Sequence, residues 1–146
     1  SGRGIEVNLD TIRSQLDDVA GIRVICPFID DIYLVAEKLR EQDDIRVIRT
    51  KDYIRSPKPN GYRSYHMIVE VPVFFMDDKE QMRAEIQLRT VAMDFWASLE
   101  HEIKYKKDIE DSESLVRELK ECADTIAETD RRMQELSNHI QQKKRV

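Results

Sequence analysis

Polar and apolar residues alternate along two runs in the middle of the chain, and this period of two predicts a pair of β-strands. In the first run, one face carries Tyr62, Ser64, His66, Ile68 and Glu70, and the other carries Met67, Val69 and Val71. In the second run, one face carries Glu85, Gln87 and Arg89, and the other carries Ala84, Ile86 and Leu88. The pattern therefore predicts two strands that each have one polar face.

A short polar link joins the two runs and predicts an antiparallel hairpin. With residues 77–78 as a two-residue loop, Glu85 lies opposite Glu70 and Arg89 lies opposite His66. The polar face of the hairpin is then either an ordinary solvated surface or the wall of a polar ligand cleft. The cleft is favoured because a basic loop that contains a glycine comes directly before the first strand.

The segments before the hairpin predict helices and further strands. Residues 8–16 have the apolar spacing of a short helix, and residues 21–26 are typical of a buried strand that Pro27 ends. Asp30 or Asp31 is placed to cap the next helix. The apolar positions of that helix recur at helical spacing and are Ile32, Val35, Ala36 and Leu39.

A second strand starts at residues 45–48, and a helix follows the hairpin over about residues 90–106. Its expected buried stripe consists of Ala92, Phe95, Trp96, Leu99 and Ile103. Helices and strands are thus interspersed along the chain, and the expected fold class is α/β, a mixed sheet flanked by helices.

The C-terminal segment has a different period. Its apolar positions step alternately by four and three, with one polar interruption, and are Leu115, Leu119, Cys122, Ile126, Thr129, Met133, Leu136 and Ile140. This seam is typical of a coiled-coil helix, which either docks on its own domain or packs against a second chain. We expect residues 108–146 to form an oligomerisation helix after a domain of residues 1–107.

Composition describes a protein with a large solvated surface. The chain has 146 residues, of which 40% are hydrophobic and 36% charged, and this suits one domain with its own core. No apolar run approaches the roughly 20 residues that span a bilayer, and no signal-peptide core precedes the first strand. Two scattered cysteines make no disulfide framework and favour a reducing cytoplasm.

Charge is distributed unevenly along the chain. A net charge of −5 argues against a general nucleic-acid binder. Between residues 49 and 66, however, five basic residues occur with one acid, Asp52; the bases are Arg49, Lys51, Arg55, Lys58 and Arg63. A local basic loop in an acidic protein suits a compact polyanion such as a nucleotide.

Four residues near this loop and the strands are candidates for chemistry. Asp18 precedes a strand and Glu85 lies within one, and two carboxylates that converge across a sheet are a common way to hold Mg²⁺. Tyr62 is placed either to stack on a base or to anchor the turn. His66 is a candidate for phosphate binding, for proton transfer or for a structural role. No Walker loop, Rossmann glycine pattern or nucleophile elbow is present.

Five ordered motifs cover about residues 16 to 107. They are Asp18-Val-Ala-Gly-Ile-Arg23, Arg49-Thr-Lys-Asp-Tyr-Ile54, Pro57-Lys-x-Asn-Gly-Tyr-Arg-Ser-x-His66, Glu85-Ile-Gln-Leu-Arg-Thr90 and Ala92-Met-x-Phe-Trp-Ala97, the last followed by Glu100-His101 and Tyr105-Lys106. In these motifs the chain resembles the RelA/SpoT-type alarmone synthetases, and most closely the small single-domain members. The resemblance implies a cytoplasmic enzyme with a nucleotidyltransferase-like fold that transfers pyrophosphate from ATP to the 3′-hydroxyl of GDP or GTP, making (p)ppGpp. It also implies a homotetramer built through the C-terminal helix.

The resemblance further implies a role for each matching residue. Asp18 and Glu85 would bind Mg²⁺, and Glu85 would also act as the general base near the 3′-hydroxyl. Tyr62 would stack on guanine, and Asn60 would help to recognise the guanosine nucleotide. Asp94 stands where small synthetases often have an asparagine that reads guanine, and an aspartate can still accept from guanine N1–H and N2–H.

The remaining matching residues would hold phosphates. The acceptor phosphates would lie against Lys51, Lys58 and His66, with Gln87 nearby, and Arg23 would reach the phosphates of ATP. Such chemistry rests on positioning and charge neutralisation, with little covalent work by the protein.

One part of the family pattern has no match. Members carry a helical region and a basic Gly-Arg-x-Lys segment that grips ATP before the Asp18 motif, whereas this chain begins 17 residues before Asp18. The acceptor site is therefore expected to be complete and the donor site incomplete. No hydrolase motif of His-Asp type occurs, so synthesis without hydrolysis is expected. Two alternatives are pyrophosphorylation of another 3′-hydroxyl, such as that of tRNA, and a non-catalytic guanine-nucleotide-binding regulatory module.

Overall fold

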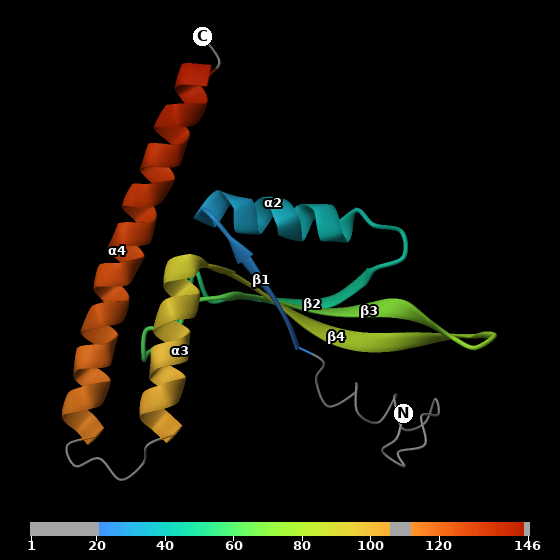
Figure 1. Cartoon of the computed structure of the whole chain (residues 1–146), viewed down its shortest axis with the longest axis horizontal. Helices are drawn as coiled ribbons and strands as arrows, with labels where there is room; N and C mark the ends of the chain where they lie inside the picture. The colour runs from blue at the N-terminus through green and yellow to red at the C-terminus, as the bar shows by residue number, and fades with distance from the viewer. Residues whose placement is uncertain (1–20, 106–111, 145–146) are drawn as a thin grey trace, which may run out of the picture.

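A computed structural model describes residues 21–105 and 112–144. The described elements are β1 (Gly21–Cys26), α2 (Ile29–Arg40), β2 (Arg46–Asp52), β3 (Tyr65–Phe75), β4 (Asp78–Thr90), α3 (Val91–Tyr105) and α4 (Ser112–Lys144) (Figure 1). The four strands form one sheet in the order β1-β4-β3-β2, in which β1 is parallel to β4 and the other pairs are antiparallel. The expected mixed sheet with flanking helices is confirmed, while the helix expected at residues 8–16 lies outside the described residues.

The core lies between α2 and the apolar face of the sheet. Met67, Val69 and Leu88 are completely buried there and pack with Ile32 and Ala36 of α2. These positions are the apolar ones of the predicted alternation, so the assignment of faces in the hairpin is confirmed. Figure 1 shows α2 across this face of the sheet, with α3 and α4 side by side at the end opposite the hairpin tip.

The register of the hairpin differs from the expected one by two residues. Phe75 pairs with Asp78, so the loop residues are 76–77, and Glu85 lies opposite Ile68 instead of Glu70. Likewise, His66 lies opposite Gln87 instead of Arg89. The loop begins one residue earlier because Met76 adopts a positive φ of 56°. Positive φ is uncommon for residues other than glycine, so the sequence does not indicate it at a methionine. A shift of two residues leaves each side chain on its expected face.

Two expectations about the first half of the fold are wrong. The strand β1 is an edge strand, in which Ile22 and Ile25 are about half exposed, so it is not the buried strand that its apolar run predicts. The N-cap of α2 is Phe28, and Asp31 instead lies in the first turn, where its Oδ2 accepts from the Phe28 backbone N–H at 3.2 Å. Asp30 also lies in that first turn, as favoured by the helix dipole.

The buried face of α3 also differs from the expected stripe. Met93, Trp96 and Ala97 are buried, whereas Phe95 is 59% exposed and Leu99 is 42% exposed. The reason is that α4 docks on one side of α3 only, through the cluster of Trp96, Ala97 and Ala123. None of the helices in the described part of the chain is both long and apolar enough to cross a membrane.

Candidate functional site

Four of the predicted site residues form one row across the sheet. In the register of the strands, Lys51 of β2 pairs with His66 of β3, His66 pairs with Gln87 of β4, and Gln87 pairs with Arg23 of β1. Paired residues of neighbouring strands point to the same face of a sheet. The row therefore brings Lys51, His66, Gln87 and Arg23 from four separate segments onto the polar face, opposite the core.

A second row, two residues away, places Glu85 on the same face. Its register partners are Ile68 in β3 and Gly21 in β1, and Gln87 Nε2 donates to Glu85 Oε1 at 2.7 Å. Asp18 lies outside the described residues. The first residue of β1, Gly21, pairs with Glu85 and comes three positions after Asp18 in the sequence. Among the residues that the structure describes, no three acidic, histidine or cysteine side chains converge on one point. The expected Mg²⁺ site therefore stays a prediction, with Glu85 as its described member.

A basic cleft of about 120 Å³ lies over these rows. It is lined by Arg49, Thr50, Lys51, Tyr53, Lys58, His66, Ile68 and Glu85. Three cationic side chains thus surround one carboxylate in a space that suits phosphate oxygens. Lys58 Nζ also lies 5.0 Å from the ring centroid of Tyr53 and 5.2 Å from that of Tyr62, which places its ammonium between the cleft and these aromatic rings.

The Gly61 loop (residues 57–64) leads from this cleft into β3. Gly61 has a φ of +100°, a conformation that favours glycine, and its N–H donates to the Lys58 carbonyl at 2.8 Å. Asn60 Oδ1 accepts from the Tyr62 backbone N–H at 3.0 Å, so Asn60 shapes the loop in addition to any contact with a ligand. The loop conformation holds Tyr62 half-buried beside the polar face.

The hydroxyl of Tyr62 connects two residues of the polar face. Arg89 Nη2 donates to it at 2.6 Å, and His66 Nε2 lies 2.9 Å away. Arginine only donates, so the hydroxyl accepts from Arg89 and its own proton is available to His66 Nε2. That arrangement requires a neutral His66 with its proton on Nδ1. Burial lowers the pKa of His66 and favours the same neutral form. A neutral His66 can still donate through Nδ1 to a phosphate oxygen.

Asp94 at the start of α3 accepts from two arginines. Arg89 Nη1 lies 3.0 Å and Arg23 Nη1 lies 3.2 Å from Asp94 Oδ1. A wider cleft of about 440 Å³ adjoins this cluster and is lined by Arg23, Tyr62, Arg89, Ala97, Ser98, Glu100, His101 and Glu102. Of the predicted site residues, Arg23 and Tyr62 line this wider cleft, and the Tyr62 hydroxyl is within hydrogen-bond distance of His66 in the basic cleft.

Arg89 is a site residue whose role sequence reasoning missed. Its side chain is almost completely buried, and besides Tyr62 and Asp94 it bonds Ser64, with Nε donating to the hydroxyl at 3.2 Å. Its place on the polar face followed from the alternation with Glu85 and Gln87, but its partners depend on the fold. Tyr53 was also missed; its ring lies edge-on to Tyr62 and His66 at centroid distances of 5.9 and 5.3 Å.

Comparison with known proteins gives one family. A family model described as a region found in RelA/SpoT proteins matches residues 5–110. GTP pyrophosphokinase YwaC of Bacillus subtilis (strain 168) is 47% identical over 131 residues, which make up 90% of this chain and 62% of that relative. The chain therefore spans less than two thirds of the length of YwaC.

Solved structures that are similar to this chain include small alarmone synthetases. Small alarmone synthetase 2 from Bacillus subtilis superposes with a TM-score of 0.78 at 42% identity, over 91% of this chain and 77% of the other. Small alarmone synthetase 1 from Bacillus subtilis, bound to its product pppGpp, superposes with a TM-score of 0.77 at 36% identity, over 93% of this chain and 69% of the other.

Proposed function

This chain belongs to the RelA/SpoT family, and from that membership we propose that it carries the acceptor side of an alarmone synthetase. The proposed reaction transfers pyrophosphate from ATP to the 3′-hydroxyl of GDP or GTP and yields (p)ppGpp. The observation that supports it most is the polar face itself, where Lys51, His66 and Glu85 line one basic cleft beside Tyr62. The substrates are nucleotides of the cytoplasm, which fits the predicted location.

In this proposal the guanosine nucleotide binds across the two clefts. Its base stacks on Tyr62, and its phosphates extend into the basic cleft toward Lys51, Lys58 and His66. Both arginine bonds to Asp94 reach Oδ1. Oδ2 can therefore accept from guanine N1–H or N2–H, while Arg89 neutralises the carboxylate charge.

Glu85 is the proposed general base. Gln87 donates to Glu85 Oε1, so this bond orients the carboxylate and leaves Oε2 to take the proton from the 3′-hydroxyl. Mg²⁺ held by Asp18 and Glu85 would neutralise charge on the transferred phosphates when it is bound. Arg23 lies in the same transverse row as Gln87, which supports its proposed role toward the phosphates of ATP.

We also propose that the protein forms a homo-oligomer through α4, a tetramer by family resemblance. Met133, Leu136 and Ile140 of the seam are each about half exposed. A groove of about 620 Å³ between α3 and α4 adds further apolar surface; Phe95, Leu99, Ile103, Leu115 and Cys122 are among its lining residues. Exposed apolar surface at both places favours burial against a second copy.

Thin-layer separation of products from labelled ATP tests the reaction in the complete protein. We expect label at the 3′ position of GDP or GTP, and Glu85→Gln should lower turnover by more than the roughly 10²–10⁴-fold loss of a general base alone. Glu70→Gln is the matched control, because Glu70 lies on the same face but pairs with Arg46 and Arg83. Label that appears on tRNA instead would identify the other acceptor class. Guanine-nucleotide binding without any transfer would show a regulatory module.

A further inference from the structure

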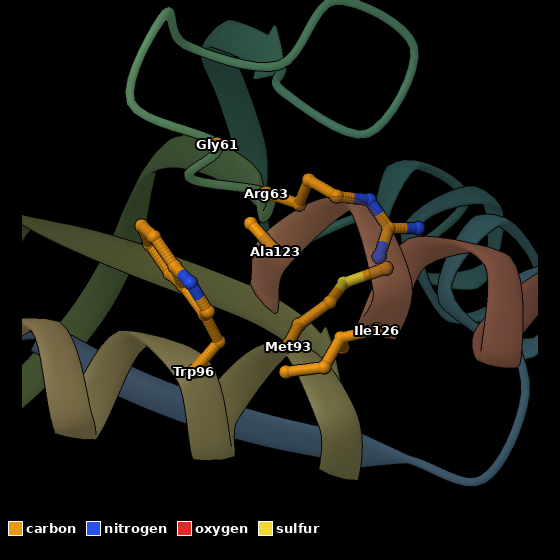
Figure 2. A pocket seen from close by; sticks show the side chains of 6 residues that line it. All are labelled: Gly61, Arg63, Met93, Trp96, Ala123 and Ile126. Carbon is orange, nitrogen blue, oxygen red and sulfur yellow. The ribbon is translucent and has the colours of Figure 1, made fainter. Parts of the chain in front are cut away.

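The C-terminal helix packs directly against the Gly61 loop. A Cβ atom added to Gly61 would lie 2.5 Å from Ala123 Cβ and 3.2 Å from Lys120 Cδ, both on α4. Figure 2 shows this contact: Gly61 and Arg63 of the loop lie over Ala123, and Trp96 and Met93 of α3 line the same small pocket. The loop that presents Tyr62 therefore lies directly on α4.

A buried ion pair joins the same two segments two residues further along the loop. Arg63 Nη1 donates to Asp130 Oδ2 at 3.3 Å, and the side chains of Arg63 and Asp130 are only 9% and 6% exposed. Thr90 Oγ1 donates to the same Oδ2 at 2.7 Å, and in turn accepts from the Met93 backbone N–H at the start of α3. One carboxylate of α4 thus bonds the Gly61 loop and the junction between β4 and α3.

This junction carries the residues that hold the proposed base-binding site. Thr90 directly follows Arg89, which bonds Tyr62 and Asp94, and Arg63 directly follows Tyr62. Buried charges are retained only where a partner satisfies them, and the loss of one partner leaves the other uncompensated. Loss of the carboxylate would therefore release both the loop and the junction on either side of Tyr62.

We propose that Asp130 is a positioning residue that fixes the Gly61 loop for the acceptor nucleotide, so that the docking of α4 sets acceptor affinity. This inference rests on the proposed function. Asp130 is more than 20 residues beyond the last family motif and touches no proposed substrate; it acts through Arg63 and Thr90. Since α4 also carries the exposed seam, the element that would assemble the protein is the element that shapes the acceptor site.

The test is Asp130→Asn in the complete protein. Asparagine keeps the volume and an acceptor for Thr90, but leaves the buried Arg63 without its counter-charge. We expect the KM for GDP or GTP to rise about tenfold, a partial loss of the base stack, while the KM for ATP changes by less than about twofold. Glu135→Gln is the control, because it removes an exposed carboxylate from the same helix, where Glu135 pairs with Arg131.

Trp96 gives a readout that does not depend on activity. It is the single tryptophan of the chain, it is 3% exposed, and its Nε1 donates to the Leu119 carbonyl of α4 at 2.8 Å. In the absence of nucleotide, Asp130→Asn should shift its emission to longer wavelength, and Glu135→Gln should not. Failure of the proposed reaction would leave this shift in place, so the two ideas are tested separately.

Three outcomes would overturn the proposal. They are an unchanged emission, an unchanged acceptor KM in a folded Asp130→Asn protein, and equal rises in the KM for acceptor and donor. If Asp130→Asn does not fold, Arg63→Lys decides the question, because lysine retains the charge but not the planar donor. A selective rise in acceptor KM for Arg63→Lys supports the proposal, and an unselective rise or none refutes it.

Discussion

Replacement of Gly61 by alanine tests the contact between the loop and α4 most directly. The new Cβ would lie 2.5 Å from Ala123 Cβ, closer than two carbon atoms can approach, and the backbone φ is +100°. Left-handed backbone costs a residue with a side chain roughly 1–2 kcal/mol. Overpacking of a filled contact costs about 1–3 kcal/mol. Gly61→Ala should therefore lower the free energy of unfolding by about 2–5 kcal/mol, the sum of these two costs.

A second substitution separates the cost of the backbone φ strain from the cost of overpacking. Ala123→Gly removes the atom that the new Cβ would strike and costs about 1 kcal/mol of helix propensity. In the double variant the φ strain remains but the overpacking is relieved, so a coupling energy of about 1–3 kcal/mol is expected. Ala127→Gly, one turn further along α4, is the control and should not rescue Gly61→Ala.

Denaturant unfolding of the wild type, the two single variants and the double variant measures the free energy of unfolding of each protein. Calorimetric titration with GDP then measures the acceptor affinity of each. Additivity of Gly61→Ala and Ala123→Gly within about 0.5 kcal/mol would show that the loop and the helix are independent. Equal rescue by Ala127→Gly would assign the effect to general helix flexibility. Either result would refute the view that α4 supports the Gly61 loop through this contact.

Two further predictions concern pH and assembly. Burial lowers the pKa of His66 in the folded protein below its ordinary value of 6.5. Between the folded pKa and the unfolded pKa, the unfolded chain therefore binds more protons than the folded protein. The stability that the neutral imidazole contributes is present above pH 6.5 and is lost as the pH falls through the folded pKa. Denaturation midpoints measured against pH should show this loss in the wild type, and His66→Gln should flatten it. Met133→Glu with Leu136→Glu should reduce the particle mass in light scattering while Trp96 emission stays unchanged, since both side chains are exposed on α4; an unchanged mass would contradict assembly through the seam.

The faces of the hairpin were predictable, whereas its register was not. Which side chains face the core depends only on the alternation, and Met67, Val69 and Leu88 are completely buried as predicted. The register depends on where the loop starts, and here Met76 adopts the positive φ with no glycine or asparagine to mark it. The polar residues were still assigned to the correct face of the sheet, because a register shift of two residues leaves each side chain on the same face.

Partners that depend on tertiary docking left no signal in the sequence. The apolar run of β1 predicts burial, but its parallel pairing with β4 places it at the edge of the sheet, which strand order along the chain does not reveal. Asp130 is one of 29 acidic residues, and only the docking of α4 brings it to Arg63 and Thr90. The family motifs located the residues that would touch nucleotide, and they contain no residue of α4.

The heptad seam overlaps the docking face of α4 at Leu119 and Ile126 but not at Met133 and Leu136, and this decides which substitutions test assembly. At about 100° per residue, Met133 lies roughly 60–80° around the helix from the buried Asp130 and Ala123, and Leu136 lies roughly 120–140° from them. Leu119 and Ile126 belong to the seam by spacing, yet both are partly buried against the cluster of Trp96, Ala97 and Ala123. Glutamate at Leu119 and Ile126 would therefore place charges beneath the Gly61 loop as well as in the seam. A loss of mass caused by that pair would be accompanied by a loss of the acceptor site, so only the exposed half of the seam can separate assembly from binding.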